Sequence, residues 1–278
     1  MFFFLMAVLT SALVSILMRV SEKHVRNNIT MLAANYAMCM VLAFLYVPGL
    51  NPFPVSDTLG RAMLMGVLNG FFYLSGFVML NWNIRKNGMV LSATFMKLGV
   101  LVPTIMAVLF FGEVPTFLQV IGILAALAAI VLIRSEKGTN KIQSSLGLLM
   151  LPLVGGMADG MSKVYEVYGS SQLNSHFLLY TFATAFVLCT ALTFVKHQSA
   201  TAKDILFGLL IGVPNYFTSR FLLLSLKNIP AIVAYPGYSV GTIVLVTLAG
   251  VAFFKEKLSR RQMAALAVIM AALAMLNL

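Results

Sequence analysis

Charged residues are scarce in this chain of 278 residues, and their scarcity sets the class of protein. Only 10% of the residues are Asp, Glu, Lys or Arg, whereas 60% are hydrophobic, and the mean hydropathy is +0.96. A soluble globular domain carries about 25% charged residues. Apolar stretches long enough to cross a bilayer recur along the whole chain. The composition therefore excludes a soluble domain and predicts a polytopic membrane protein.

Cysteine and histidine are also scarce, which argues against several kinds of site. The two cysteines, Cys39 and Cys189, each lie inside an apolar segment and form no C-x-x-C pair, so neither a disulfide framework nor a metal site is indicated. The three histidines, His24, His176 and His197, lie far apart, and no G-x-S-x-G nucleophile motif occurs. We therefore expect no metal, no cofactor and no enzymatic activity.

Acidic residues are few as well, eight against 19 Lys and Arg, which gives a net charge of +11. The basic residues lie in short connections between apolar segments, where the positive-inside rule explains them better than nucleic-acid binding does. Most occupy odd-numbered connections: Lys23, Arg26, Arg85, Lys86, Arg134, Lys137, Lys141, Lys196, Lys203, Lys255, Lys257, Arg260 and Arg261. The even-numbered connections carry only Arg61 and Lys227. We expect no nucleic-acid partner, a place in the cytoplasmic membrane, odd-numbered connections in the cytoplasm and both termini outside.

Ten apolar segments are long enough to span a bilayer. They cover residues 1–20, 30–48, 61–82, 88–111, 116–133, 144–167, 174–195, 203–226, 230–254 and 259–277. Backbone groups in lipid must be paired within their own segment, so each segment is predicted to be a helix. The first has no basic n-region and no cleavage site, so we interpret it as a retained helix rather than a signal peptide. The predicted fold class is an all-α polytopic membrane protein with ten transmembrane helices.

The chain contains an internal duplication. The stretch at 87–113 returns at 230–256, 143 residues later, and both copies end in the motif Phe-Phe-x-Glu, at Glu113 and at Glu256. The third spans match too, since each contains a G-x-x-x-G pair, which favours close approach of two helices. These pairs are Gly66 with Gly70 and Gly208 with Gly212.

A polar linker at 134–143 divides the ten spans into five and five. An odd number of spans in each copy makes the two copies enter the membrane from opposite sides. We therefore predict two inverted five-helix repeats, residues 1–134 and residues 144–278.

These features resemble the drug/metabolite transporter superfamily, in particular its EamA-type members. The resemblance covers the whole chain and rests on the ten spans, the two five-helix halves and the Phe-Phe-x-Glu motif at the end of the fourth helix of each half. It implies a secondary carrier that works by alternating access, with a central cavity lined by helices one to four and six to nine. It also implies that helices five and ten are peripheral. Many relatives have cytoplasmic termini, opposite to the orientation that the charges predict here.

Lys97 is a cation near the middle of the fourth span, about 15 Å from the basic connection at Arg85 and Lys86. A charge at that depth costs several kcal/mol, so it should face protein or a wet cavity. Thr94 and Thr104 fall on the same face of the helix and form a polar stripe with it. The stripe could bind a carboxylate or phosphate of a substrate. Alternatively, Lys97 is a structural residue paired with a buried acid.

Three further charged side chains lie inside predicted spans. Arg220 stands in a polar stretch with Asn215, but about 24 Å from the basic end of its helix, where a snorkelling arginine is equally compatible. Asp159 and Lys163 are four residues apart on one helix face and can neutralise each other. Alternatively, Asp159 is a protonatable coupling site.

Aromatic and hydroxyl side chains supply the remaining candidates for substrate binding. Tyr235, Tyr238 and Ser239 recur on one face of the ninth span, where Pro236–Gly237 is predicted to interrupt the helix. Such a break can expose backbone groups to a ligand, although a structural proline kink is the ordinary alternative. In the third span, Tyr73 is the candidate for the cavity wall.

Four glutamates are predicted to be structural. Glu22 and Glu166 each follow a basic residue by three positions, Arg19 and Lys163, and are expected to form ion pairs at helix ends. The two motif glutamates, including Glu256, are expected to cap the helix that follows them.

Two hypotheses for the function follow from these residues. The first is a secondary transporter of a small organic metabolite with an anionic group, for which Lys97 and Arg220 are counter-charges, since neither has an acid within reach in its own helix. The second is a proton-coupled exporter of amino acids or amphipathic drugs, in which Lys97 pairs with Asp159 and Met and Phe side chains form an adaptable pocket. An inverted repeat with a charge at the membrane midplane is more typical of a transporter than of an enzyme, a flippase or a scaffold. The expected partners are a small-molecule substrate and the lipid bilayer, with the chain as a monomer or homodimer.

Overall fold

The structure is a computed structural model, which describes residues 2–102, 105–106, 116–118, 120–122, 124–125, 145–195, 199–226, 231–256, 258 and 260–275. Its helices are α1 (Phe2–Ser21), α2 (Asn28–Leu45), α3 (Leu59–Asn87), α4 (Met89–Lys97), α7 (Ser145–Tyr168), α8 (Asn174–Val195), α9 (Ala202–Leu226), α10 (Ala231–Ala252) and α11 (Arg260–Met275). Short 3-10 turns lie at Pro48–Leu50, Leu98–Val100 and Ser171–Leu173. Each helix falls on one of the predicted spans.

Five helical stretches of the described residues are long and apolar enough to cross a membrane by themselves. They are Phe2–Ser21, Asn28–Leu45, Leu59–Asn87, Ser171–Val195 and Ala202–Ser225. Two shorter apolar stretches, Met89–Val100 and Gly237–Ala252, belong to the fourth and ninth spans. The fifth span, at 116–133, lies largely outside the described residues.

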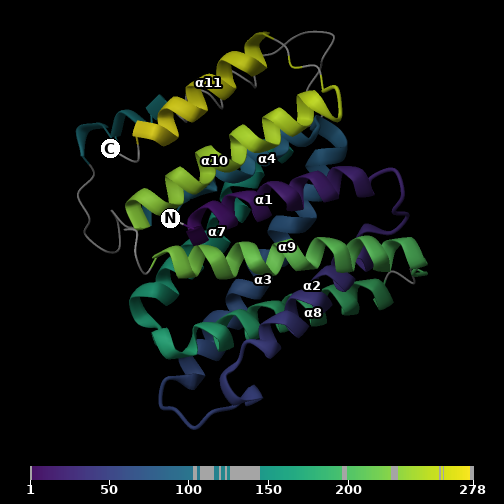
Figure 1. The fold of residues 1–278 in the computed structure, drawn as a ribbon, viewed down its shortest axis with the longest axis vertical. Coiled ribbons are helices and arrows are strands. Elements are labelled where there is room, and N and C mark those ends of the chain that lie inside the picture. The colour runs from purple at the N-terminus through teal and green to yellow at the C-terminus, as the bar shows by residue number, and fades with distance from the viewer. Residues whose placement is uncertain are drawn as a thin grey trace.

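Helices of the first half pack against helices of the second half in a symmetric pattern. α1 packs on α9 as α7 packs on α3, α2 packs on α9 as α8 packs on α3, and α1 packs on α10 as α7 packs on α4. The pairs α2 with α8 and α4 with α10 each join equivalent helices of the two halves. Figure 1 shows α1 between α9 and α10, in agreement with these contacts. The predicted fold class, an all-α polytopic membrane protein with two inverted repeats, is confirmed, whereas the boundaries 1–134 and 144–278 stay a prediction.

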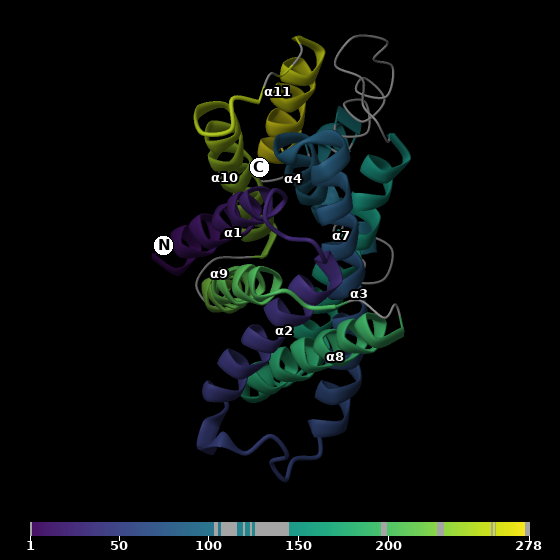
Figure 2. The ribbon, with the colours of Figure 1, turned by 90° about the vertical axis from the view of Figure 1, so that its right-hand side faces the viewer.

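Helix α11 lies at the edge of the molecule. Its packing partner among the described helices is α10, and Figures 1 and 2 show it at one end of the long axis, opposite the connection from α2 to α3. The tenth helix is thus peripheral, as the family resemblance implied.

The G-x-x-x-G pairs bring helices of opposite halves into backbone contact. A Cβ added at Gly70 would lie 2.4 Å from the carbonyl oxygen of Thr181 in α8. A Cβ at Gly212 would lie 2.6 Å from the carbonyl oxygen of Asn35 in α2. Both distances are too short for a side chain, so these crossings require glycine. The predicted close approach is confirmed in both halves.

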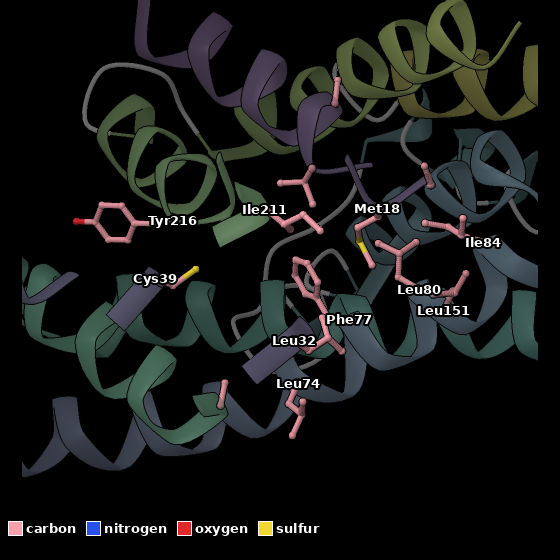
Figure 3. Close-up of a cluster of buried hydrophobic side chains, with 14 of the residues drawn as sticks. Met18, Leu32, Cys39, Leu74, Phe77, Leu80, Ile84, Leu151, Ile211 and Tyr216 are labelled. Carbon is pink, nitrogen blue, oxygen red and sulfur yellow. The ribbon is translucent and has the colours of Figure 1, made fainter. Parts of the chain in front are cut away.

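A buried apolar cluster joins helices from both halves. Figure 3 shows Met18 of α1, Leu32 of α2, Phe77 of α3, Leu151 of α7 and Ile211 of α9 within it. Leu32, Leu151 and Ile211 are at most 1% exposed. Because each half contributes to one cluster, the two halves form a single packed unit.

The expected interruption of the ninth span is wrong, and a break lies in the fourth span instead. α10 runs as α-helix through Pro236–Gly237, whereas α4 changes to a 3-10 turn at Leu98–Val100, directly after Lys97. Pro236 stands in the second turn of α10, where it forfeits one backbone hydrogen bond near the helix end. The break in the fourth span coincides with a close crossing, since a Cβ at Gly99 would lie 2.7 Å from the Gly156 nitrogen of α7. A 3-10 stretch inside a longer helix is a frequent site of hinges.

Candidate functional site

A cavity of about 100 Å³ lies between the two halves. Six helices line it: α1, α3 and α4 of the first half and α7, α9 and α10 of the second. Its polar wall consists of Ser11, Ser15, Tyr73, Lys97, Asp159, Asn215, Thr218, Ser219 and Tyr238. The second and seventh spans, which the resemblance included in the wall, contribute no side chain to this lining of described residues.

Lys97 stands at the end of α4 with its ammonium in the cavity wall. Its Nζ donates a hydrogen bond of 2.7 Å to the Tyr238 hydroxyl and lies 3.9 Å from the centroid of that ring. The Tyr238 hydroxyl in turn donates to the Ser11 hydroxyl at 2.8 Å. A chain of three polar side chains from α4, α10 and α1 therefore holds the ammonium in place.

Asp159 of α7 lines the same cavity, and its charge attracts that of Lys97. The two do not form a direct ion pair, because no N–O distance between them is within 4.0 Å. The predicted neutralisation of Asp159 by Lys163 is not what the structure shows, since Lys163 lies 3.4 Å from Glu166 instead. Lys163 prefers the acid one turn further along α7, which leaves Asp159 facing the cavity.

Tyr73 and Asn215 are also found in the cavity wall, as predicted. The Tyr73 hydroxyl is hydrogen-bonded to the Ser219 hydroxyl at 2.8 Å. The Asn215 amide donates to Asn35 of α2 at 3.3 Å. These bonds link the first half to α9 of the second half, so the polar wall is shared between the halves.

Arg220 is predicted as a second counter-charge, but the structure places it away from the cavity lining. Its guanidinium stacks on Tyr46, 3.7 Å from the ring centroid, and donates to the Tyr216 hydroxyl at 3.2 Å. A cation over an aromatic face is stabilised without an acid. These contacts support the structural interpretation of Arg220.

The other candidates lie elsewhere or outside the described parts of the chain. Thr94 is buried and donates to the Val90 carbonyl of its own helix at 2.7 Å, and Ser239 is buried but does not line the cavity. Thr104 and the side chain of Tyr235 lie outside the described residues.

Sequence reasoning missed the two hydroxyls that α1 contributes to the wall, Ser11 and Ser15. Serine is common in membrane helices, and nothing in the first span marked this face. Their spacing of four residues, which places both on one helix face, is the one signal that was available. Thr218 and Ser219 belong to the polar stretch beside Arg220. The apolar part of the wall, including Phe72, Phe77 and Met96, carried no signal beyond hydrophobicity.

The acids at helix ends behave partly as predicted. Arg19 pairs with Glu22 and Lys163 pairs with Glu166, so both predicted end pairs are confirmed. Within the described part of the chain, Glu256 bonds not to the helix that follows it but to backbone N–H groups at the start of α4, which belongs to the other half.

The cavity combines one cation, one anion and several hydroxyls, enclosed by apolar helices of two inverted halves. Such a site can bind a small polar molecule away from lipid, at the interface where repeats move against one another in transporters. The fold and the cavity together define the class: a polytopic membrane protein built as a carrier of small molecules.

The comparison with known families agrees with that class. Residues 1–135 match the EamA-like transporter family, and residues 175–269 match the Small Multidrug Resistance protein family. These matches are consistent with a drug/metabolite transporter of the EamA-like type. The family indicates a membrane transporter of small molecules and points to transport rather than catalysis.

Two similar proteins cover nearly the whole chain. An uncharacterised protein of Haemophilus influenzae is 24% identical over 267 residues, which are 91% of this chain and 90% of that protein. A crystal structure of a protein at 14% identity superimposes with a TM-score of 0.66, covering 99% of this chain and 96% of the other. The second likeness shows the fold alone.

Proposed function

We propose that the protein is a secondary active transporter that moves a small organic metabolite with an anionic group across the cell membrane by alternating access. The observation that carries the proposal is the ammonium of Lys97, which faces the cavity with hydroxyl partners and has no carboxylate of a described residue within 4.0 Å. A cation held in an apolar interior is costly unless an anion accompanies it. A carboxylate or phosphate of the substrate would supply that anion and form a charge-assisted hydrogen bond.

The experiment is a thermal-shift screen of the purified protein against carboxylates, sugar phosphates, nucleotides, amino acids and quaternary amines, repeated with Lys97→Gln. A ligand at about 100 times its Kd stabilises the folded state by about 2.7 kcal/mol, so even weak ligands register at millimolar concentration. We expect anions to stabilise the wild type and the Lys97→Gln variant to bind them roughly tenfold to a hundredfold more weakly, because a hydrogen bond to a charged group is lost.

Lys163→Gln is the matched control. It also removes one lysine charge from a membrane helix, but this lysine bonds to Glu166 and does not line the cavity. Binding and transport of every accepted substrate by Lys97→Gln at wild-type strength would overturn the proposal.

The second candidate is a proton-coupled exporter of amino acids or amphipathic drugs, in which Asp159 is the coupling site. It is favoured by the place of Asp159 in the same cavity as Lys97, because an ionised carboxylate there opposes the binding of a simple anion. A zwitterion, or a proton on Asp159, would relieve that repulsion. The same screen separates the candidates, since stabilisation by amines or zwitterions that survives Lys97→Gln supports the exporter. Transport by Asp159→Asn with undiminished pH dependence would exclude it.

A further inference from the structure

Glu256, in the connection between α10 and α11, bonds to two helices of the first half. Its Oε1 accepts a hydrogen bond of 3.0 Å from the Met89 backbone N–H, and its Oε2 accepts one of 3.2 Å from the Val90 N–H. The Arg19 Nε of α1 lies 3.5 Å from Oε1. One carboxylate of the second half thus joins the end of α1 to the beginning of α4.

Glycines near Glu256 allow the two halves to approach each other closely. Gly88, directly before α4, has a φ of +82°, and a Cβ added there would lie 3.5 Å from the Glu256 carboxylate. A Cβ added at Gly250, near the end of α10, would lie 2.3 Å from Cγ2 of Val90. The Glu256 side chain is 11% exposed, and Met89 and Val90 are fully buried. This end of the molecule is therefore closed by direct contact between the halves.

Both helices that Glu256 joins carry cavity residues a short distance further in. Lys97 lies seven residues after Val90, about 10 Å along the helix, and Ser15 lies four residues before Arg19, about 6 Å. The 3-10 turn at Leu98–Val100 follows Lys97 directly. The part of α4 that begins at the Glu256 contact and ends at that turn is therefore one short rigid helix, and it carries the ammonium.

We propose that Glu256 is a positioning residue of the transport site: by binding the start of α4 and the end of α1, it holds Lys97 in place and keeps this end of the cavity closed. Release of its three bonds lets α10 separate from α4 and opens the cavity at this end. The proposal goes beyond the transport function and rests on it only in requiring that the chain opens and closes.

The chemistry of the contact suits a closure that forms and breaks. A carboxylate at a helix start binds backbone N–H groups and the positive end of the helix dipole, so the contact is strong but depends on a single side chain. Glu22 shares the Arg19 guanidinium. Burial raises the pKa of Glu22 above its ordinary value, while the Arg19 charge opposes that shift. Arg19 therefore retains an acidic partner when Glu256 moves away.

The test measures access to the cavity without any ligand. A cysteine replaces Ser15, which lines the cavity and is 5% exposed, and membrane vesicles are treated with a thiol reagent that cannot cross the bilayer, added from either side. Losing one charge-assisted hydrogen bond shifts an opening equilibrium by roughly tenfold, so Glu256→Gln should raise the labelling rate from one side by roughly that factor. The control Glu166→Gln removes an acid whose ion pair with Lys163 stays within α7, and it should leave the rate unchanged.

A second measurement keeps the proposal falsifiable if Glu256→Gln folds poorly. Cysteines at Val90 and Gly250 are close enough to form a disulfide when this end is closed, and Glu256→Asp, with its shorter side chain, should lower the yield of that disulfide. Unchanged labelling and unchanged cross-linking in folded variants would overturn the proposal and leave the transport function standing. Labelling that rises equally from both sides would identify Glu256 as merely structural and would also overturn it.

Discussion

Tyr238 is the residue on which the geometry of Lys97 depends. Its hydroxyl accepts from the ammonium, its ring lies under the same ammonium, and it donates onward to Ser11. A buried ammonium without such partners costs several kcal/mol, and a flexible lysine stem would leave it in many rotamers. The tyrosine therefore fixes both where the cation lies and which of its protons remain for a ligand.

We expect Tyr238→Phe to weaken ligand binding by roughly tenfold to a hundredfold, because the hydrogen bond to a charged group is lost while the ring is kept. Titration of the thermal shift with the best ligand of the screen measures this change. Tyr165→Phe is the control, since its hydroxyl bonds to the Ser170 carbonyl at 2.8 Å outside the cavity. A loss of affinity of the same size in both variants would contradict the assigned role.

Among single residues, the sequence predicted the charged side chains of the cavity wall better than the neutral ones. Lys97 and Asp159 were found because an ionisable residue inside an apolar span is conspicuous. Arg220 has the same signature but is satisfied by Tyr46 and Tyr216, which no sequence distance reveals.

The helices are held together across the halves by glycine contacts. Gly66 and Gly70 of α3 meet α8, and Gly208 and Gly212 of α9 meet α2, with backbone atoms in direct contact. In a bilayer, where lipid tails are as apolar as leucine, such close packing is a main source of helix association.

We expect Gly70→Ala to lower the free energy of unfolding by about 1–3 kcal/mol, because its Cβ would lie 2.4 Å from a backbone oxygen that cannot move alone. Thermal unfolding of the purified protein in detergent measures the effect. Gly60→Ala is the matched control in the same helix, since a Cβ there has no neighbour within 4 Å. Equal stability of the two variants would show that the crossing is looser than described.

Helix positions could be predicted because the hydrocarbon core fixes their length, and the segment predicted at 174–195 coincides with α8. The break after Lys97 could not be predicted, since it arises where Gly99 meets Gly156 of another helix. Pro236–Gly237 predicted a helix break that is absent, because a proline near the start of a helix costs only one backbone hydrogen bond. The partner of Glu256 was missed because Met89 lies 167 residues away in the chain.

For the whole molecule, the distribution of basic residues predicts an orientation in the membrane. The basic residues of the odd-numbered connections favour a cytoplasmic place for those connections and outside termini. The symmetric packing of the halves is equally compatible with either orientation, so the charges alone carry this proposal.

We expect a cysteine at Val55, in the second connection, to react with an impermeant thiol reagent on intact cells, and one at Ser199, in the seventh connection, to react only after permeabilisation. Both positions are exposed, and the native Cys39 and Cys189 are buried, so background labelling is low. The reverse pattern would place both termini in the cytoplasm.

The division of the cavity charges between the halves bears on how the protein is made. Lys97 belongs to α4 and Asp159 to α7, so the lysine is synthesised and inserted before the carboxylate of the cavity lining exists. Insertion of such a residue costs about 2.5–3.5 kcal/mol at the centre of a helix. Before α7 is made, the Lys97 charge lies in the bilayer without the Asp159 carboxylate, the acid of the cavity lining among the described residues. We expect the sixth helix to be the step of biogenesis that first brings these two opposite charges into one interior.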